Sequence, residues 1–315
     1  MNKLRIVFMG TPTFAAGVLD AICKNDYNVV GVITAADKPA GRGQKLNYSA
    51  VKQYALDNNL TLLQPSNLKE ETFLSDLKAL NADVQVVVAF RMLPQIVWQM
   101  PKFGTFNLHA SLLPDYRGAA PINWAIINGD TKSGVTTFFI DDKIDTGAII
   151  LKAEIEIGDD ENAGQLHDRL IFLGSDVVLE TLQMINSGAV TVKHQIEHSD
   201  MKAAPKLTKE TCRINFEKSI NEIHNFVRGL SPYPAAWCNF NDNGQLWNVR
   251  IFETSKSKEK HDHKIGQIFA GKKDLKIAVC DGYINVVALQ FPGKKKMVVG
   301  EFLNGMKLSA EAFVS

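Results

Sequence analysis

The feature that most constrains the fold is a series of continuous apolar runs, each separated from the next by a helical or polar stretch. The runs are rich in β-branched residues and show no polar alternation: LRIVFMG (4–10), VVGVIT (29–34), DVQVVVAF (83–90), GTFNLHA (104–110) and GVTTFFI (134–140). Between them lie helical patterns at 13–24, 49–58 and 119–128. This alternation indicates a parallel sheet covered by helices on both faces. Ligands bind such sheets at the carboxyl ends of the strands.

The second part of the chain follows a different pattern. Leucines and valines at helical spacing predict one long helix over 163–187, and the polar stretch that follows contains Pro205. Beyond it, a helix is expected near 219–229, followed by short strands with Gly and Asp turns, which favour a small β-barrel. We therefore predict a first domain over 1–198, a linker over 199–209 and a second domain over 210–315.

Charge is unevenly distributed between the two parts. Residues 1–204 hold 18 Lys and Arg against 23 Asp and Glu, whereas residues 205–315 hold 17 against 11. A basic second part suggests contact with a polyanion such as nucleic acid, although such asymmetry also arises by chance. The four cysteines form no CxxC pair, which argues against a zinc site or a disulfide framework. We expect no membrane segment and a cytoplasmic protein, because the N-terminus lacks a signal-like apolar region.

Asn107 and His109 lie at the end of the run GTFNLHA, in the stretch FNLHASLLPDYRGAAP (106–121). Two residues apart on a strand, they point to the same side of the sheet. Their side chains can both donate hydrogen bonds, and together they could stabilise an oxyanion, an effect of about 3 kcal/mol per donor in other enzymes. The alternative is a core histidine that donates to a backbone carbonyl.

Asp145 follows the next strand, within FFIDDKIDTGAI. A carboxylate in this turn could orient His109 and relay protons. A single aspartate in a turn means little, but Asn, His and Asp at neighbouring strand ends indicate a catalytic trio. No nucleophile elbow and no HExxH pattern is present, so the chemistry implied is direct attack by a bound amine or water.

The loop ADKPAGRGQKLN (36–47) places Arg42 between Gly41 and Gly43, with Lys45 nearby. Glycines leave the backbone mobile and the basic side chains exposed, as suits a loop that binds a phosphate backbone. A flexible surface loop with solvated charges explains the pattern equally well. The first strand ends in MGTPTFAAG, which is not a GxGxxG fingerprint, so a dinucleotide site is poorly supported.

Taken together, five motifs closely resemble the methionyl-tRNA formyltransferase family, a group of 10-formyltetrahydrofolate-dependent formyltransferases. They are FMGTPTFA, DKPAGRGQKL, NLHASLLPDYRGAAPINWAI, DTGAI and RGLSPYPAAW, which span nearly the whole chain. The resemblance implies an α/β fold, with a Rossmann-like formyltransferase domain followed by an OB-like barrel that binds tRNA. It also implies transfer of the formyl group of 10-formyltetrahydrofolate to initiator methionyl-tRNA, without a metal, by a monomer.

The resemblance also assigns site residues. The family's catalytic trio matches Asn107, His109 and Asp145. Its folate-binding positions match Ser111, Leu112, Leu113, Pro114, Phe90, Arg91, Met92, Leu93, Ile140, Asp141 and Asp142. Its tRNA-binding loop matches Gly41, Arg42, Gly43 and Lys45. Lys206 of the basic second part is also expected to bind tRNA, although a solvated face is the alternative reading for any single lysine.

Two departures from the family pattern stand out. The segment AFRMLP is one residue shorter than the family's aromatic-Gly segment, and Lys143 replaces the first Gly of the D-x-G-x-D-T-G turn. Three other functions share much of the pattern. They are formylation of a small amine such as a sugar nucleotide or purine precursor, hydrolysis of formyl-folate, and non-catalytic RNA binding on a degenerate scaffold. The intact trio argues against the last.

Overall fold

The structure, a computed structural model, describes residues 3–40 and 45–315. The chain forms two compact units, each assembled from separate stretches of sequence. Residues 1–118, 133–155 and 167–203 form the first, which we name the sheet unit. Residues 119–132, 156–166 and 204–315 form the second, the barrel unit. The contiguous domain boundaries at 198 and 209 remain a prediction.

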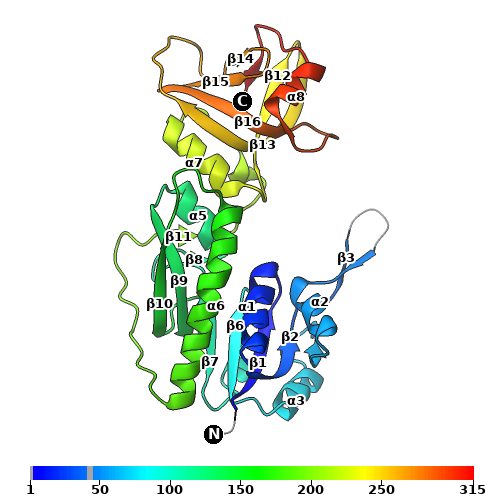
Figure 1. The fold of residues 1–315 in the computed structure, drawn as a ribbon, viewed down its shortest axis with the longest axis vertical. Helices are drawn as coiled ribbons and strands as arrows, with labels where there is room; N and C mark the ends of the chain where they lie inside the picture. Colours follow the sequence, from blue (N-terminus) through cyan, green and yellow to red (C-terminus); the bar gives the residue numbers. More distant parts are fainter. Residues whose placement is uncertain (1–2, 41–44) are drawn as a thin grey trace. The chain divides into compact units, whose positions relative to one another are not determined.

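The sheet unit is built on one seven-stranded sheet with the order β10-β9-β7-β6-β1-β2-β5 (Figure 1). Its strands are β1 (Arg5–Gly10), β2 (Asn28–Ile33), β5 (Leu62–Leu63), β6 (Val84–Val88), β7 (Thr105–His109), β9 (Lys132–Phe139) and β10 (Ile149–Glu156). From β5 to β7 every pairing is parallel, which confirms the predicted fold class. β9 differs, because it runs antiparallel to β7. A buried apolar run reads the same in either direction, so the sequence pattern could not show this.

Helices cover both faces of the sheet. α6 packs closely on one face, since a Cβ on its Gly174 would lie 2.8 Å from Leu108 of β7, and Gly17 of α1 meets Ile171 of α6 in the same way. On the other face, an apolar cluster joins β1, β2 and β6 to α3 and α4. Thr105 lies on this second face, where its hydroxyl donates to the carbonyl of Trp98 at the end of α4. Strand alternation therefore points Asn107 and His109 away from α6.

The helical patterns of the sequence correspond well to the helices of the structure. The helices are α1 (Thr13–Lys24), α2 (Ala50–Asp57), α3 (Glu71–Ala79), α4 (Gln95–Trp98), α5 (Pro121–Ile127), α6 (Ala163–Ser187), η1 (Glu210–Cys212), α7 (Ile220–Leu230) and α8 (Val299–Gly305). Four short strands complete the connections: β3 (Lys38–Ala40), β4 (Lys45–Asn47), β8 (Arg117–Gly118) and β11 (Ala203–Ala204). The bounds of α6 are those predicted from its leucine spacing, which shows how well a long amphipathic helix is marked in sequence.

The barrel unit holds an antiparallel sheet with the order β14-β15-β16-β13-β12-β18, with β17 paired to β16. Its strands are β12 (Ala236–Asp242), β13 (Gln245–Ser257), β14 (Ile268–Ala270), β15 (Leu275–Val279), β16 (Gly282–Gln290), β17 (Met297–Val298) and β18 (Phe313–Val314). A bridge between Gln267 and Phe313 joins the two ends of the strand order, so the sheet nearly closes on itself. This confirms the predicted small barrel. Residues of α7 pack into its apolar core.

Local sequence explains two elements of the barrel unit. The turn between β12 and β13 is Asn243–Gly244, and both residues have positive φ, as a tight two-residue hairpin requires. The Ser219 hydroxyl accepts a hydrogen bond from the backbone N–H of Glu222, whose carboxylate accepts one from the backbone N–H of Ser219. This capping box fixes the start of α7. It also lowers the pKa of Glu222 to about 2, chiefly through hydrogen bonds from Ser219.

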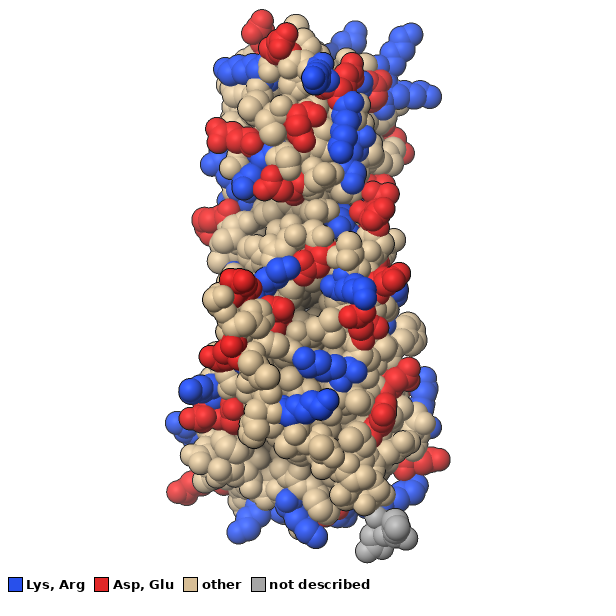
Figure 2. Space-filling view, turned by 90° about the vertical axis from the view of Figure 1, so that its left-hand side faces the viewer, with Lys and Arg blue, Asp and Glu red and all other residues tan. Residues whose placement is uncertain are grey.

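The surface carries charges of both signs. In Figure 2, Lys and Arg side chains of the barrel unit project into solvent with Asp and Glu side chains between them.

Within residues 3–40 and 45–315, no helix is long and apolar enough to cross a membrane.

Candidate active site

His109 ends β7 and is held by its own following loop. Its side chain is buried, and Nε2 donates a 2.8 Å hydrogen bond to the backbone carbonyl of Tyr116. Tyr116 has a φ of 61°, a left-handed conformation that turns its carbonyl back toward the strand end. The alternative prediction, a histidine bonded to a backbone carbonyl, therefore holds for Nε2. The other ring nitrogen, Nδ1, faces a different group.

Asp145 supplies that group. It lies in the turn between β9 and β10 with a φ of 55°, and its Oδ2 lies 3.8 Å from Nδ1 of His109. The same oxygen accepts a 3.0 Å hydrogen bond from the backbone N–H of Gly118. Both nitrogens of the imidazole thus face oxygen atoms, an arrangement in which a protonated ring can donate from either side. The structure brings His109 and Asp145 together as the sequence predicted.

Asn107 lies on the same side of β7, between Val87 of β6 and Phe138 of β9 in the strand register. Its side chain is half-buried and makes no hydrogen bond to any residue that the structure describes. A half-buried amide with its donors free is suited to bind a polar group of a substrate. The three side chains of the predicted trio therefore come from one strand end and one neighbouring turn.

The turn that carries Asp145 is tightly packed. A Cβ on Gly147 would lie 1.7 Å from the carbonyl oxygen of Phe139, so only glycine fits. Asp141 organises the start of the turn, because its Oδ1 accepts hydrogen bonds from the backbone N–H of Lys143 and the hydroxyl of Thr146. The Lys143 side chain is exposed, which explains how the turn accommodates it in place of glycine.

The loop Ser111–Pro114 is anchored on its sheet side. The Thr136 hydroxyl donates to the carbonyl of Ser111 at 2.7 Å and accepts from the backbone N–H of Leu113. Lys152 of β10 donates to the Leu113 carbonyl, and burial lowers the pKa of this lysine. The Leu113–Pro114 peptide bond is cis. These contacts hold the loop immediately after His109 in one conformation.

Comparison with known proteins shows the family of this chain. The family model described as formyl transferase matches residues 4–182, and the model of the formyl transferase C-terminal domain matches residues 206–307. The methionyl-tRNA formyltransferase of Flavobacterium johnsoniae is 63% identical over 314 residues, covering 100% of both chains. The chain belongs to the methionyl-tRNA formyltransferase family. A family member from Bacteroides thetaiotaomicron is 51% identical over 313 residues, covering 98% of this chain and 97% of its own.

Solved structures share the fold of this family at lower identity. An N-formyltransferase from Helicobacter canadensis, in complex with folinic acid and dTDP-3-aminofucose, has a TM-score of 0.64 and 21% identity over 93% of this chain and 100% of its own. HypX from Aquifex aeolicus, in complex with tetrahydrofolic acid, has a TM-score of 0.65 and 17% identity over 98% of this chain and 49% of its own. At these identities the likeness concerns the fold.

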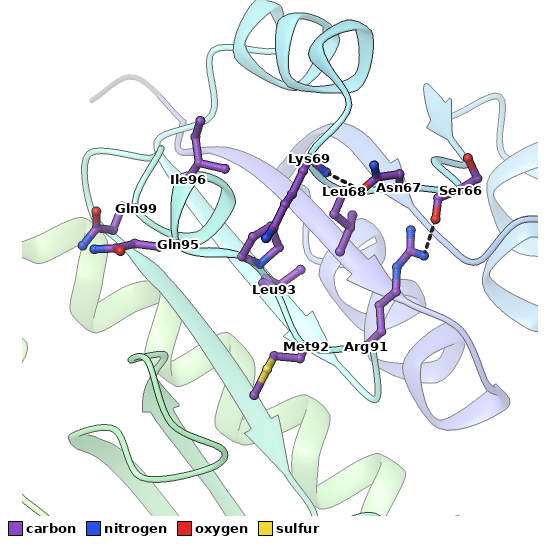
Figure 3. Close-up of a pocket in the computed structure, with 11 residues that line it drawn as sticks. Ser66, Asn67, Leu68, Lys69, Arg91, Met92, Leu93, Gln95, Ile96 and Gln99 are labelled. Carbon is purple, nitrogen blue, oxygen red and sulfur yellow. Dashed lines mark hydrogen bonds between the residues drawn. The ribbon is translucent and has the colours of Figure 1, made fainter.

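Three residues that the family resemblance assigned to folate line a groove of about 960 Å³. Arg91, Met92 and Leu93 form one part of it, and residues 66–69, residues 94–96 and Gln99 form the rest (Figure 3). Arg91 donates a hydrogen bond to the carbonyl of Ser66, shown as a dashed line in Figure 3, and this bond joins two segments that line the groove. Met92 is 65% exposed and adds apolar surface to the groove. The groove thus combines apolar surface with exposed amides of Asn67, Gln95 and Gln99.

The remaining folate positions lie in different surroundings. Phe90 and Ile140 pack against the apolar cluster that contains Leu93, and Asp142 is exposed. The backbone N–H and C=O groups of residues 90–93 make no hydrogen bond to any residue in the described part of the chain. These backbone groups are available to the polar edge of a flat heterocycle. The assignment of these positions to folate remains a prediction.

The tRNA-binding positions are only partly visible. Gly41, Arg42 and Gly43 lie outside the described residues. Lys45 begins β4, which pairs antiparallel with β3, and Lys206 is exposed in the barrel unit. Their contact with tRNA also remains a prediction.

Sequence reasoning missed four groups around the trio. Two are backbone atoms, the Tyr116 carbonyl and the Gly118 N–H, which no side-chain pattern can indicate. The other two are the side chains of Arg117 and Gln195, which hydrogen-bond to one another. The resemblance motif contains Arg117, but nothing in the sequence marks Gln195. Among the described residues, no cluster of His, Cys, Asp and Glu is placed to hold a metal ion.

Proposed function

We propose that this chain transfers the formyl group of 10-formyltetrahydrofolate to the free α-amine of methionyl-initiator tRNA. The observation that carries the proposal is the placement of His109 beside Asp145, with the free Asn107 amide on the same strand face, in a member of this family. Relatives that match this chain over its whole length are named for the enzyme that catalyses that reaction. The products are N-formylmethionyl-tRNA and tetrahydrofolate.

The reaction proceeds by direct attack. The amine nitrogen uses its lone pair to attack the formyl carbon, and the electrons of the carbonyl bond move to oxygen. Asn107 donates hydrogen bonds to that oxyanion. A protonated His109, whose Nε2 is bonded to Tyr116 and whose Nδ1 lies beside Asp145, donates to it from Nδ1–H. The carbon–N10 bond then breaks. The attacking nitrogen loses a proton to Asp145, and that proton passes to N10.

Asp145 has two tasks in this scheme. Its carboxylate stabilises the charge on His109, and it accepts the proton that the amine loses. The hydrogen bond from the Gly118 N–H keeps one carboxylate oxygen directed at His109. The other oxygen can then face the substrate amine. Bringing both substrates into one geometry supplies much of the rate, because it removes the entropy cost of their encounter.

The folate would bind along the segments 90–93, 111–114 and 140–142. The half-buried Phe90 and Ile140 suit the faces of a flat pterin, and the unbonded backbone groups of 90–93 suit its polar edge. The groove beside Arg91 has the volume and the mixed polar and apolar lining for part of the rest of the molecule. Formyl transfer from an activated formamide needs only proton movement and charge stabilisation, so we propose that no metal takes part.

The tRNA would contact the loop that includes Arg42 and Lys45 and the basic barrel unit, including Lys206. Because such contacts go mainly to phosphates, binding should weaken steeply with salt. We further propose that the enzyme is located in the cytoplasm and acts as a monomer, the oligomeric state that the family resemblance implies.

The experiment that tests the function is a formyl-transfer assay with initiator and elongator methionyl-tRNA at about 50 mM and about 200 mM salt. Selective formylation of the initiator, with a Michaelis constant that rises with salt, supports the proposal. Folate binding without transfer to tRNA would overturn it and favour a small-amine acceptor or a hydrolase. Asn107→Ala should lower kcat by about 10²–10³-fold, and near-normal turnover of this variant would exclude the oxyanion role.

A further inference from the structure

One side chain of the extended segment that follows α6 hydrogen-bonds to the backbone of the Asp145 turn. Lys193 of this segment pairs antiparallel with Ile149, through two backbone hydrogen bonds of 2.8 and 2.9 Å. In antiparallel register, the residue two positions after Lys193 lies opposite the residue two positions before Ile149. Gln195 therefore lies beside Gly147. Its Nε2 donates to the carbonyl of Gly147 and to the carbonyl of Asp145, each at 2.9 Å.

Arg117 fixes the orientation of this amide. Nε and one terminal nitrogen of its guanidinium donate to Oε1 of Gln195, at 3.2 and 2.7 Å. The amide oxygen thus faces only donors and the amide nitrogen faces only acceptors, so the assignment of the two atoms is unambiguous. A further guanidinium nitrogen donates to Oε1 of Glu197 at 2.8 Å and lowers the pKa of that exposed carboxyl group.

The neighbours of Arg117 touch both partners of the catalytic pair. The carbonyl of Tyr116 accepts from Nε2 of His109, and the N–H of Gly118 donates to the Asp145 carboxylate. Tyr116 and Asp145 both have left-handed backbone conformations, which persist only where surrounding contacts hold them. Gln195 therefore completes a chain of contacts that runs from His109 through residues 116–118 and back to the Asp145 backbone.

We propose that Gln195 is a positioning residue for formyl transfer, whose amide, oriented by Arg117, holds the Asp145 turn so that the carboxylate stays beside His109. This inference rests on the proposed function and extends it to a residue that does not touch the reacting atoms. An amide is needed because the same group must donate to two carbonyls and accept from a guanidinium. Neither a carboxylate nor an apolar side chain of the same length can do both.

The test compares Gln195→Met and Gln195→Glu with the wild-type chain in the formyl-transfer assay. Gln195→Met keeps the side-chain volume but loses every hydrogen bond, and we expect kcat to fall at least tenfold while KM for folate changes less than about threefold. The matched control is Gln64→Met. The Gln64 amide also donates to two oxygens of the sheet unit, those of Ala35 and Asp37. It makes none of the contacts that link His109, residues 116–118 and Asp145. We expect its kcat to stay within twofold of wild type.

Gln195→Glu provides a second readout, the pH dependence of kcat, which would not change if Gln195 had a purely structural role. The introduced carboxylate still accepts from Arg117 but cannot donate to the two carbonyls, so activity should be low at neutral pH. As the pH falls and the carboxyl group takes a proton, it can donate again, and kcat relative to wild type should rise. A wild-type kcat and pH profile for this variant would overturn the proposal, as would equal losses of kcat in Gln195→Met and Gln64→Met.

The wild-type chain separates the two hypotheses. If it formylates methionyl-tRNA and both Gln195 variants match it, the proposed function stands and the positioning role fails. If it shows no transfer, the proposed function fails, and the role of Gln195 in that reaction fails with it.

Discussion

Nδ1 of His109 lies 3.8 Å from Oδ2 of Asp145, while Nε2 of the same ring donates to the carbonyl of Tyr116. The first distance is longer than a hydrogen bond, so the two side chains are aligned without being locked together. The ring is therefore fixed from one side and left adjustable on the side that would face the substrate. We expect this contact to tighten when substrate binds, as catalytic contacts generally do.

The first prediction concerns the charge of Asp145. In Asp145→Asn, the amide oxygen can still accept from the Gly118 N–H, so the turn should keep its shape. The variant loses the negative charge beside His109 and the proton acceptor. We expect kcat to fall by on the order of 10²–10⁴-fold with little change in folate KM. Single-turnover formylation checks this, and unchanged thermal unfolding would show that the fold is intact. A kcat within fivefold of wild type would exclude both tasks of Asp145.

Gly147 gives a prediction about the backbone of the same turn. In Gly147→Ala, the new methyl group would overlap the Phe139 carbonyl, so the turn must move and carry Asp145 with it. We expect a loss of stability of about 1–3 kcal/mol, typical of overpacking, and a loss of most activity. The matched control is Gly305→Ala, since no atom lies within 4 Å of the corresponding methyl position. Denaturant unfolding and the transfer assay measure the two effects, and a Gly147→Ala protein as stable and active as this control would contradict the packing argument.

Lys152 allows the loop 111–114, which we propose binds folate, to be tested away from the trio. Its ammonium group donates to the Leu113 carbonyl, so Lys152→Met should release one anchor of the Ser111–Pro114 loop. Hydrogen bonds to charged groups contribute about 1.5–3 kcal/mol, but burial lowers the pKa of this lysine and offsets part of that gain. We expect folate KM to rise about tenfold with kcat less affected. Lys78→Met, on the exposed face of α3, should leave folate KM unchanged. Equal folate KM values in the two variants would show that Lys152 does not support the loop.

The relation between sequence and structure differs from one part of the site to another. Asn107 and His109 could be placed on one strand face from their spacing alone, because strand alternation has a strict period of two. Asp145 could be placed at a neighbouring strand end, since β9 was readable as an apolar run. The direction of β9 was not readable, because a run buried on both faces has no polarity.

Gln195 marks the limit of sequence reasoning here. It lies in a polar segment without periodicity, and its place beside Gly147 depends on the pairing of Lys193 with Ile149, a contact across 44 residues of sequence. Likewise, the Tyr116 carbonyl and the Gly118 N–H belong to the backbone, so their roles depend on local conformation and not on residue type. Residue types showed which groups could react, but tertiary pairing determined which groups hold them.

The last prediction concerns pH and the barrel unit. His224 of α7 is buried, with Nδ1 at 3.0 Å from the Thr254 hydroxyl and Nε2 at 3.1 Å from Asp160. Burial lowers the pKa of His224, and the nearby Lys256 and Arg228 add to this, while Asp160 acts in the opposite direction. The folded chain thus binds a proton at this site less readily than the unfolded chain, whose histidine has a pKa of about 6.5.

The sign of the effect follows from this difference. Above about pH 6.5 both states hold a neutral His224 and stability is at its full value. As the pH falls below about 6.5, the unfolded chain takes up a proton that the folded chain resists, so the free energy of unfolding decreases until the folded-state pKa is reached. Urea unfolding of wild type and His224→Gln between pH 8 and pH 5 measures this loss of unfolding free energy. Glutamine is the suitable replacement because it can still pair with Thr254 and Asp160 but does not titrate. The variant should lose less stability than wild type over this range, and identical losses would assign the pH dependence to other groups.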